Sequence, residues 1–554
     1  MKKPKTQRIL AGGSIGLALF VASAIAGMWV AYDSSLGWPI LLALLGSVGL
    51  FFIIANSTII SRWIAGGLVI IASLFAIYFV GQYAHFNYQD ETGPLAHLGR
   101  ATGSLLPNLV FLTPHPNAAA GFLEGTLLLN LVLIWQARGL RRLVWGLTAT
   151  ITAYGLLISG SRGAWSGLVV AAGIWISLRC PKYASMVVGL GLGLTASFLL
   201  SLYVISLLGL PDPNIPLLSS MLNTSNSRLI LYRNSLALLG DYPFTGIGLG
   251  DTFAMLYSRY QLFINVPYLY YAHNLFLSVA LGQGILGIVA LVWLLIEFYH
   301  FVIRVERVGL NEQSLPIFRA AWLGTTTSLI HGLTDSVQFS RDYWTMPMLF
   351  ALAGLTIAIG HPTLAQIDPG QVSRVSTQKY HRKKWIGLAA IAIALAIPLA
   401  VFWRVVASAW YANVGAIYQA QADLSPNVDD ATREVIMTRA SVYFEHALDL
   451  NPSQAVANRR LGMMALERQD FDTAIVYLER AYAQEPQNQA ILKTLGYAYL
   501  WTGRLDQAQE LFWQVDFRSR LVDELRYWHW WWSTKGQENL SAYAGEMAQR
   551  LVSE

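Results

Sequence analysis

Apolar runs of membrane-spanning length recur along the first 408 residues of this 554-residue chain. A helix that crosses a bilayer needs about 20 mostly apolar residues. Runs of this kind lie at 9–31, 37–56, 63–83, 114–136, 141–160, 163–179, 184–210, 274–303, 316–339, 343–360 and 385–408. Because a backbone in lipid must satisfy its own hydrogen bonds, each run is expected to be a helix, and 274–303 is expected to break near Gly282-Gln283-Gly284. The pattern predicts an all-α, polytopic bundle of about 11 transmembrane helices.

The positions of the charged residues predict how this bundle is oriented. Only 13% of the residues are charged, and the net charge of +6 comes from basic residues in short loops between apolar runs. Cytoplasmic loops of membrane proteins carry the excess of lysine and arginine, so the N-terminus and each basic cluster are expected in the cytoplasm. The loops 84–113 and 211–273 and all residues after Ser408 are then expected outside. Membrane topology accounts for the basic residues, and no nucleic-acid partner is expected.

The last part of the chain, residues 409–554, is charged and water-compatible, and it carries a period of 34 residues. Residues 456–489 align with 490–523, with Gly462 opposite Gly496. Small residues at such positions let paired helices approach closely, and the apolar positions fill the space between them. The pattern resembles the tetratricopeptide repeat.

A third, partial repeat is expected before these two, with Trp410–Ala422 as its first helix. Stacked helical repeats present concave surfaces, so this extracytoplasmic α-solenoid is expected to dock a protein partner or an acceptor, with a rigid spacer as the plainer alternative. The aromatic run Tyr527–Trp532 fits stacking on sugars, a place at the membrane interface or the core of a capping helix, and the sequence leaves these readings open. The chain is thus expected to divide into a transmembrane catalytic domain, 1–408, and a repeat domain, 409–554.

Arg162 is the first candidate for chemistry. It lies in Ser159–Trp165, whose small residues allow a tight turn between two spans on the outer side. An arginine at this depth is costly unless it faces a cavity or pairs with an anion. The alternative is a side chain that reaches the lipid headgroups.

The outer loop 211–273 holds the second candidate, Arg228. An amphipathic helix is expected to begin near Asn226, with that residue or Ser227 as its cap. Because a helix N-terminus carries partial positive charge and free N–H groups, Arg228 is expected where an anion binds best, with Arg233 as a weaker companion.

His273 ends the same loop where the next helix is expected to begin. A histidine with a pKa near neutral can take a proton from a hydroxyl. A histidine at a helix start is more often structural, but two arginines on the same outer side favour chemistry. His331 and Asp335, four residues apart in the predicted span 316–339, are expected on one helix face as polar packing or as support for this cavity.

Metal binding is not expected. The single cysteine, Cys180, excludes a thiolate cluster and a disulfide framework. The outer loops have no Asp-x-Asp pair and no paired histidines at helical spacing. Asp33, in the first outer loop, is the one acid that a metal-dependent or acid–base glycosyltransferase of this topology would use.

Several short motifs, taken in order, resemble those of the O-antigen ligase and polymerase superfamily. They are His115-Pro116-Asn117, Ser161-Arg162-Gly163, Arg228 with Tyr232, Pro243–Gly248, His273–Leu277 and Gly284–Gly287. The resemblance implies a multi-pass protein of the bacterial cytoplasmic (inner) membrane that uses an undecaprenyl-diphosphate-linked glycan at the outer face. It also implies inverting transfer that needs neither a metal nor another cofactor.

The resemblance further implies roles for single residues. Arg162 and Arg228 would clamp the diphosphate and stabilise the charge on the leaving group. His273 would orient or deprotonate the acceptor hydroxyl, and Arg233 and His115 would be lesser contacts to the diphosphate or the lipid carrier. The acceptor stays open between a lipid core, a cell-envelope glycan and a protein.

Three other functions remain open at the level of sequence. One is a polysaccharide polymerase that extends the lipid-linked glycan on its carrier. Another is a transporter or flippase, which would place charges at the bilayer midplane, where Glu124 is the main example. The third is a scaffold without catalytic activity that displays the repeats.

Overall fold

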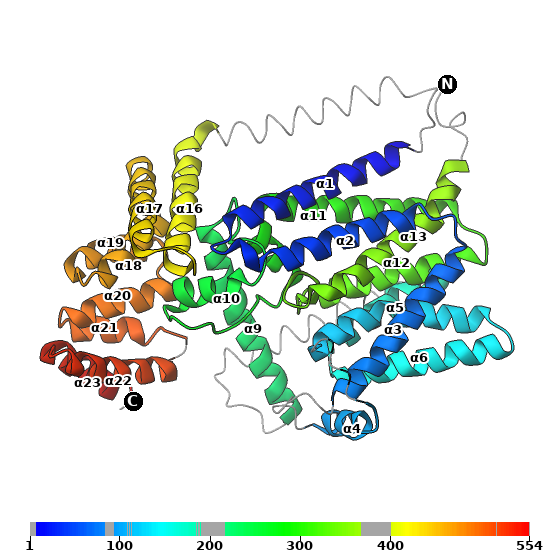
Figure 1. Cartoon of the computed structure of the whole chain (residues 1–554), viewed down its shortest axis with the longest axis horizontal. Coiled ribbons are helices and arrows are strands. Elements are labelled where there is room, and N and C mark those ends of the chain that lie inside the picture. Colours follow the sequence, from blue (N-terminus) through cyan, green and yellow to red (C-terminus); the bar gives the residue numbers. More distant parts are fainter. Residues whose placement is uncertain are drawn as a thin grey trace.

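The computed structural model describes residues 7–83, 93–107, 109, 111, 114–183, 185–186, 189, 216–366, 400–516 and 518–552. Within these residues every regular element is a helix, which confirms the all-α prediction for the described part of the chain. Figure 1 shows long helices running side by side in a bundle, with shorter stacked helices at one end of it.

The helices of the first 366 residues form the bundle, except for α9 and α10, which lie at its end (Figure 1). They are α1 (Gln7–Val30), α2 (Trp38–Ala55), α3 (Ser61–Tyr83), α4 (Pro94–Gly103), α5 (Pro116–Gln136), α6 (Leu140–Ser159), α7 (Arg162–Arg179), α9 (Pro216–Asp241), α10 (Thr252–Tyr257), α11 (Leu275–Val308), α12 (Ser314–His331) and α13 (Met346–Gln366). Short helical turns are η1 (Ser34–Leu36), η2 (Pro181–Tyr183), η3 (Ser258–Leu262), η4 (Val337–Phe339) and η5 (Tyr343–Thr345). The backbones of α5 and α12 approach closely at Gly125 and Gly324: a side chain on Gly324 would collide with the Gly125 carbonyl oxygen, and one on Gly125 would collide with Leu352 of α13.

Six described helical stretches are long and apolar enough to cross a membrane. They are Ser34–Ala55, Ser61–Tyr83, Pro116–Gln136, Leu140–Ser159, Leu275–Val308 and Tyr343–Leu364, and Ile15–Val30 is a shorter apolar stretch. The chain is therefore a multi-pass membrane protein. The predicted spans 163–179 and 316–339 correspond to α7 and α12, which are not among the six, and most of 184–210 and 385–408 lies outside the described residues. The count of about 11 helices stays a prediction.

Two details of the predicted spans are decided by the structure. The break in the run 274–303 is confirmed, because Gly284 interrupts α11 with φ 64° and ψ −161°. The prediction that His331 and Asp335 share a helix face is wrong, since α12 ends at His331. Asp335 lies on the turn that follows, although its N–H still donates to the His331 carbonyl at 3.0 Å.

The C-terminal part is a stack of four helix pairs. They are α16 (Trp403–Leu424) with α17 (Asp430–Leu450), α18 (Ala455–Glu467) with α19 (Phe471–Gln484), α20 (Gln489–Trp501) with α21 (Leu505–Phe512), and α22 (Arg518–Thr534) with α23 (Glu538–Arg550). In the first three pairs a glycine of one helix packs against a large side chain of the other, and these contacts are Gly415 with Phe444, Gly462 with Leu478 and Gly496 with Phe512. The recurring contact confirms the third repeat unit. The predicted domain boundary at residue 408 falls inside α16, and the division into two domains stays a prediction.

The aromatic run is divided between the two faces of α22. Trp532 is 8% exposed and belongs to the core of the last helix pairs, whereas Tyr527 and Trp530 are more than half exposed. One face therefore fills the core, as a capping helix would, and the other remains on the surface.

The stacked repeats pack directly on the segment that follows α9. Figure 1 shows α9 and α10 between the bundle and the repeats. Asp241, at the end of α9, is buried and pairs with both Arg459 and Arg460 of α18. The Arg460 guanidinium also lies 3.6 Å from the ring centroid of Tyr260 in η3. Buried charges are tolerated only when paired and hydrogen-bonded, so this cluster fixes how the two parts fit together.

Candidate functional site

His273 lies on the segment that leads into α11, and a buried carboxylate holds its ring. Its Nδ1 is 3.3 Å from Oδ1 of Asp335, a side chain that is 2% exposed. A proton on Nδ1 is donated to this carboxylate, which leaves Nε2 as the free basic nitrogen. The His273 backbone has φ 49°, the left-handed region that non-glycine residues rarely adopt. Such backbone strain persists only where the surroundings impose it.

Asp335 accepts hydrogen bonds from both sides of its carboxylate. The Ser336 N–H donates to Oδ1 at 2.7 Å, and the Asn117 amide donates to Oδ2 at 2.6 Å. Asn117 lies in the first turn of α5, and its own N–H donates to Nδ1 of His115, the N-cap of that helix, at 3.2 Å. His115 is therefore connected to His273 through Asn117 and Asp335.

The His273 segment is attached to the turn after α12 along its length. The Asn274 amide donates to the Leu333 carbonyl at 2.9 Å, and the Leu275 N–H donates to the Gly332 carbonyl at 2.7 Å. Asn274 also caps α11 by accepting from the Leu277 N–H at 3.0 Å. These bonds fix the start of α11, and therefore His273, against the end of α12.

Arg228 reaches the same segment from α9. Its guanidinium donates to the His273 carbonyl at 3.5 Å, and the Tyr232 hydroxyl, one turn further along α9, donates to the same oxygen at 2.9 Å. The prediction that Arg228 marks a helix N-terminus is wrong, because α9 begins at Pro216 and Arg228 lies about three turns inside it. The charge at this position therefore comes from the guanidinium itself.

Arg162 begins α7, and its neighbours dock on the end of α12. Ser161 caps α7 through the Ala164 N–H, and its hydroxyl is 3.2 Å from Nε2 of His331. The other ring nitrogen of His331 is 2.9 Å from Oε2 of the fully buried Glu124. A side chain at Gly163 would collide with His331, which explains the glycine after Arg162. The Arg162 side chain itself is exposed.

Three helix N-termini thus meet around one turn. The caps of α5, α7 and α11 are His115, Ser161 and Asn274, and each helix start is bonded to the segment His331–Asp335 directly or through a neighbouring residue. Helix N-termini carry partial positive charge and unpaired N–H groups, which favour anions. Arg162 and Arg228 add two cations at this end of the bundle, beside the buried carboxylates of Glu124 and Asp335.

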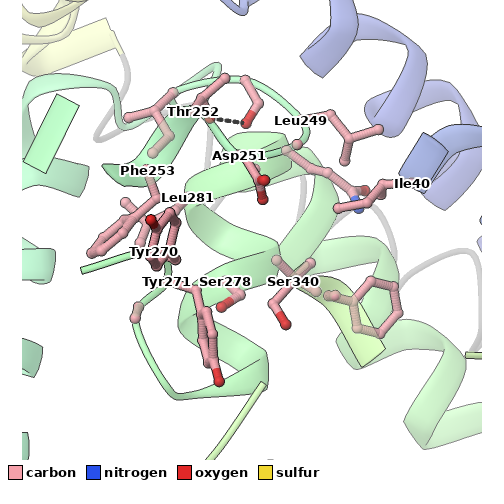
Figure 2. A pocket seen from close by; sticks show the side chains of 18 residues that line it. Ile40, Leu249, Asp251, Thr252, Phe253, Tyr270, Tyr271, Ser278, Leu281 and Ser340 are labelled. Atoms are coloured by element: carbon pink, nitrogen blue, oxygen red, sulfur yellow. Dashed lines mark hydrogen bonds between the residues drawn. The ribbon is translucent and has the colours of Figure 1, made fainter. Parts of the chain in front are cut away.

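A small pocket lies near His273 and is lined in part by Tyr271 and Ala272, which precede it. Its volume is about 40 Å³, and it is lined by residues of the segments 247–253, 270–272 and 278–283 together with Ile40, Phe339 and Ser340. Figure 2 shows Asp251, Ser278 and Ser340 turned toward the space between these segments. The pocket joins the His273 segment to the glycine-rich turn after α9.

Titratable groups around this pocket are strongly perturbed. Burial raises the pKa of the Tyr271 hydroxyl, whose ring centroid is 4.1 Å from that of His273; the charges of Asp335 and Asp342 raise the pKa further, and Arg228 opposes them. Burial raises the pKa of Asp342 to about 6, and the Trp344 hydrogen bond counteracts it. Clusters of shifted pKa values are typical of functional sites.

The remaining sequence candidates lie elsewhere. Arg233 points to the repeats, where its guanidinium pairs with Asp516. Asp33 caps η1 by accepting from the Ser35 N–H at 2.9 Å. Among the described residues no group of three or more His, Cys, Asp or Glu side chains is placed to hold a metal ion.

Sequence reasoning did not identify the residues that connect the candidates. Asn117 is only a member of the motif 115–117, Tyr271 lies just before the motif 273–277, and Asp335 is expected as support for the cavity rather than as the direct partner of His273. The signal for Asp335 was its polarity in an apolar run, next to His331.

Two segments of the chain match known family models. Residues 147–292 match the family model described as O-Antigen ligase, and this range includes Arg162, Arg228, Arg233 and His273. Residues 465–518 match the tetratricopeptide repeat model. No curated protein matches the chain. Over residues 147–292 the chain is thus similar to O-antigen ligases, a family of membrane glycan ligases and polymerases, and over residues 465–518 it is similar to tetratricopeptide repeats.

Proposed function

We propose that this protein transfers a glycan from undecaprenyl diphosphate to an acceptor hydroxyl at the outer face of the bacterial cytoplasmic membrane. The observation that carries the proposal is the pairing of His273 with buried Asp335, at a place where two arginines and three helix N-termini concentrate positive charge. A base beside an anion site is what attack on a sugar diphosphate requires.

His273 acts as the general base. Its Nε2 takes the proton of the acceptor hydroxyl while the hydroxyl oxygen forms a bond to the anomeric carbon. Asp335 holds the Nδ1 proton and stabilises the imidazolium that results. The orientation of the ring is fixed by the bonds of Asn274 and Leu275 to the turn after α12.

The arginines act on the leaving group. As the anomeric C–O bond breaks, its electrons pass to the diphosphate, which departs with the lipid. Arg162 and Arg228 bind the diphosphate oxygens and stabilise this charge, in the role that a metal ion has in other transferases. Attack from the face opposite the leaving group inverts the anomeric configuration. In this proposal Arg233 and His115 are lesser contributors to binding of the lipid carrier, and no metal or other cofactor takes part.

The acceptor is a lipid core, a cell-envelope glycan or a protein. In this proposal the N-terminus lies in the cytoplasm and the repeats lie outside, on the side where lipid-linked glycans are consumed. The positions of the basic residues along the chain and the packing of the repeats on the His273 side of the bundle support this orientation.

The test is transfer by the purified full-length protein. Wild type and His273→Ala are incubated with undecaprenyl-diphosphate-linked glycan and with lipid, sugar or peptide acceptors. Loss of product by about 100-fold or more is expected for His273→Ala. A matched control is His446→Ala, an exposed histidine of α17, which is expected to keep the wild-type rate.

The product distinguishes a ligase from a polymerase. A ligase leaves the lipid carrier free and the glycan on the acceptor, whereas a polymerase lengthens the glycan that remains on the carrier. Wild-type transfer by His273→Ala would contradict the proposed mechanism.

A further inference from the structure

A second hollow lies between the ligase part and the repeats. Its volume is about 40 Å³, and it is lined by residues of α9, η3, α20 and α22 and of the segments that join them. Compared with the volume that one buried water occupies, the hollow has room for about three waters or a similar number of ligand atoms. It is open on one side, so a larger molecule can insert one edge.

Two buried amides on the ligase side of this hollow have unpartnered atoms. Gln261 is 1% exposed, and neither its Nε2 nor its Oε1 has a hydrogen-bond partner among the described residues. Asn234 is 2% exposed, and its Nδ2 likewise has none. Buried amides without partners are costly for the folded state. Both residues line the hollow, so a ligand whose binding turns these amides toward it would gain two donors and one acceptor.

The repeat side of the hollow offers charges that are already paired. Lys493 lies 2.7 Å from Glu524, and Asp516 pairs with Arg233. Tyr268 adds an aromatic ring, with the Arg520 guanidinium 4.5 Å from the ring centroid. Since these charges largely compensate one another, the hollow does not favour an anion. Hydroxyl and acetamido groups, which are neutral and both donate and accept, complement the free amide atoms.

The hollow is connected to the proposed transfer site by a single helix. Arg228 and Asn234 both lie on α9, six residues apart, which corresponds to about 9 Å along the helix axis. A short oligosaccharide attached to a diphosphate at Arg228 can span this distance.

We propose that the hollow around Gln261 and Asn234 is a sugar-binding subsite, which holds a neutral sugar unit of the transferred glycan through its hydroxyl or acetamido groups. The inference rests on the proposed function, because it assigns the ligand as part of the same donor. It also gives the repeats a direct role, since α20 and α22 complete the subsite.

The test compares Gln261→Leu and Asn234→Leu with wild type in the full-length protein. Gln261→Leu removes two unpartnered polar atoms, so its melting temperature is expected to stay or rise, whereas Asn234→Leu also removes the hydrogen bond of Asn234 to Tyr257 and is expected to lower the melting temperature. The KM for a donor that carries a full repeat unit is expected to rise about 10-fold with kcat unchanged. A donor with only the first sugar is expected to be unaffected. Gln484→Leu, at an exposed glutamine of α19, is the control.

Binding is measured separately from transfer. The probe is the oligosaccharide released by mild acid from the lipid-linked donor, titrated into the purified protein and followed by calorimetry. Wild type is expected to bind it, with affinity reduced about 10-fold in Gln261→Leu. Inorganic pyrophosphate is expected to bind wild type and Gln261→Leu equally and to lose affinity in Arg228→Ala.

The outcomes separate the two proposals. Absence of oligosaccharide binding by wild type, or equal binding by Gln261→Leu and Asn234→Leu, overturns the subsite. Binding that depends on Gln261 in a protein that transfers no glycan supports the subsite and overturns the proposed ligase function.

Discussion

Asp335 and His273, 62 residues apart in the chain, meet with their carboxylate and imidazole 3.3 Å from each other. The carboxylate is buried, whereas the histidine side chain is 21% exposed. A base that faces solvent on one side and a fixed acceptor on the other is oriented before any substrate arrives. Four predictions follow from this arrangement and from the contacts around it.

Replacing Asp335 with Asn is expected to lower kcat about 100-fold or more. The amide cannot stabilise an imidazolium and can present N–H to Nδ1, which favours the wrong tautomer of His273. The KM for the lipid-linked donor is expected to stay within a few-fold, because the arginines bind it. Steady-state kinetics measure both constants, and Asp472→Asn, at an exposed acid of α19, is the control. An Asp335→Asn enzyme with wild-type kcat would refute the role given to this pair.

Replacing Arg228 with Lys is expected to lower kcat/KM for the donor on the order of 10-fold, and Ala on the order of 100-fold. Lysine keeps the charge but loses the planar fork that binds phosphate oxygens in pairs. Arg233→Lys serves for comparison, because Arg233 is half exposed and paired with Asp516. Its effect is expected to be about 3-fold or less. Equal losses of kcat/KM in Arg228→Lys and Arg233→Lys would argue against diphosphate binding by Arg228.

Asp342 is expected to make stability fall as pH rises. Its folded pKa of about 6 lies above the ordinary value of 3.8, so the folded state binds the extra proton between these values. The contribution of the protonated Asp342 to the free energy of unfolding is therefore fully present below about pH 4 and is lost as pH rises through 6. The melting temperature of Asp342→Asn relative to wild type should be higher at about pH 7.5 than at about pH 4.5. A constant difference at both pH values would contradict the raised pKa.

Replacing Asp241 with Asn is expected to destabilise the protein by about 3–5 kcal/mol. The change leaves the buried guanidiniums of Arg459 and Arg460 without a countercharge. Thermal unfolding in detergent measures the loss. Asp516→Asn, which breaks the pair of Asp516 with the half-exposed Arg233, is the matched control and is expected to cost about 1 kcal/mol or less. Similar melting temperatures for the two variants would contradict the proposed anchoring role of the buried cluster.

Local patterns predicted the helices well and the contacts between them poorly. Local sequence determines the apolar runs, the break at Gly284 and the repeat glycines. In such short segments the spacing and the length of the hydrophobic pattern decide the structure. The start of α9 was misplaced because Asn226 and Ser227 are good caps, yet the helix continues through them. Capping preference is weak evidence when neighbouring residues also favour the helix.

The sequence predicted which residues belong to the candidate site but not the hydrogen bonds that connect them. Arg162, Arg228 and His273 were chosen for residue type and expected side, whereas the bond of Asn117 to Asp335 joins residues 218 apart. Hydrogen bonds over such separations have no local signature. The sequence also could not show that Arg233, one turn beyond Arg228, contacts the repeats instead.

The buried pairing of Asp241 with Arg459 and Arg460 has a consequence for how the repeats can be studied. A chain cut before Trp403 would leave this carboxylate without cations and would uncover the rings of Tyr242 and Tyr260. Loss of activity after such a truncation would report damage to the segment that carries His273 and not the absence of acceptor docking. Point changes on the exposed face of the stack are the informative way to ask what the repeats recognise.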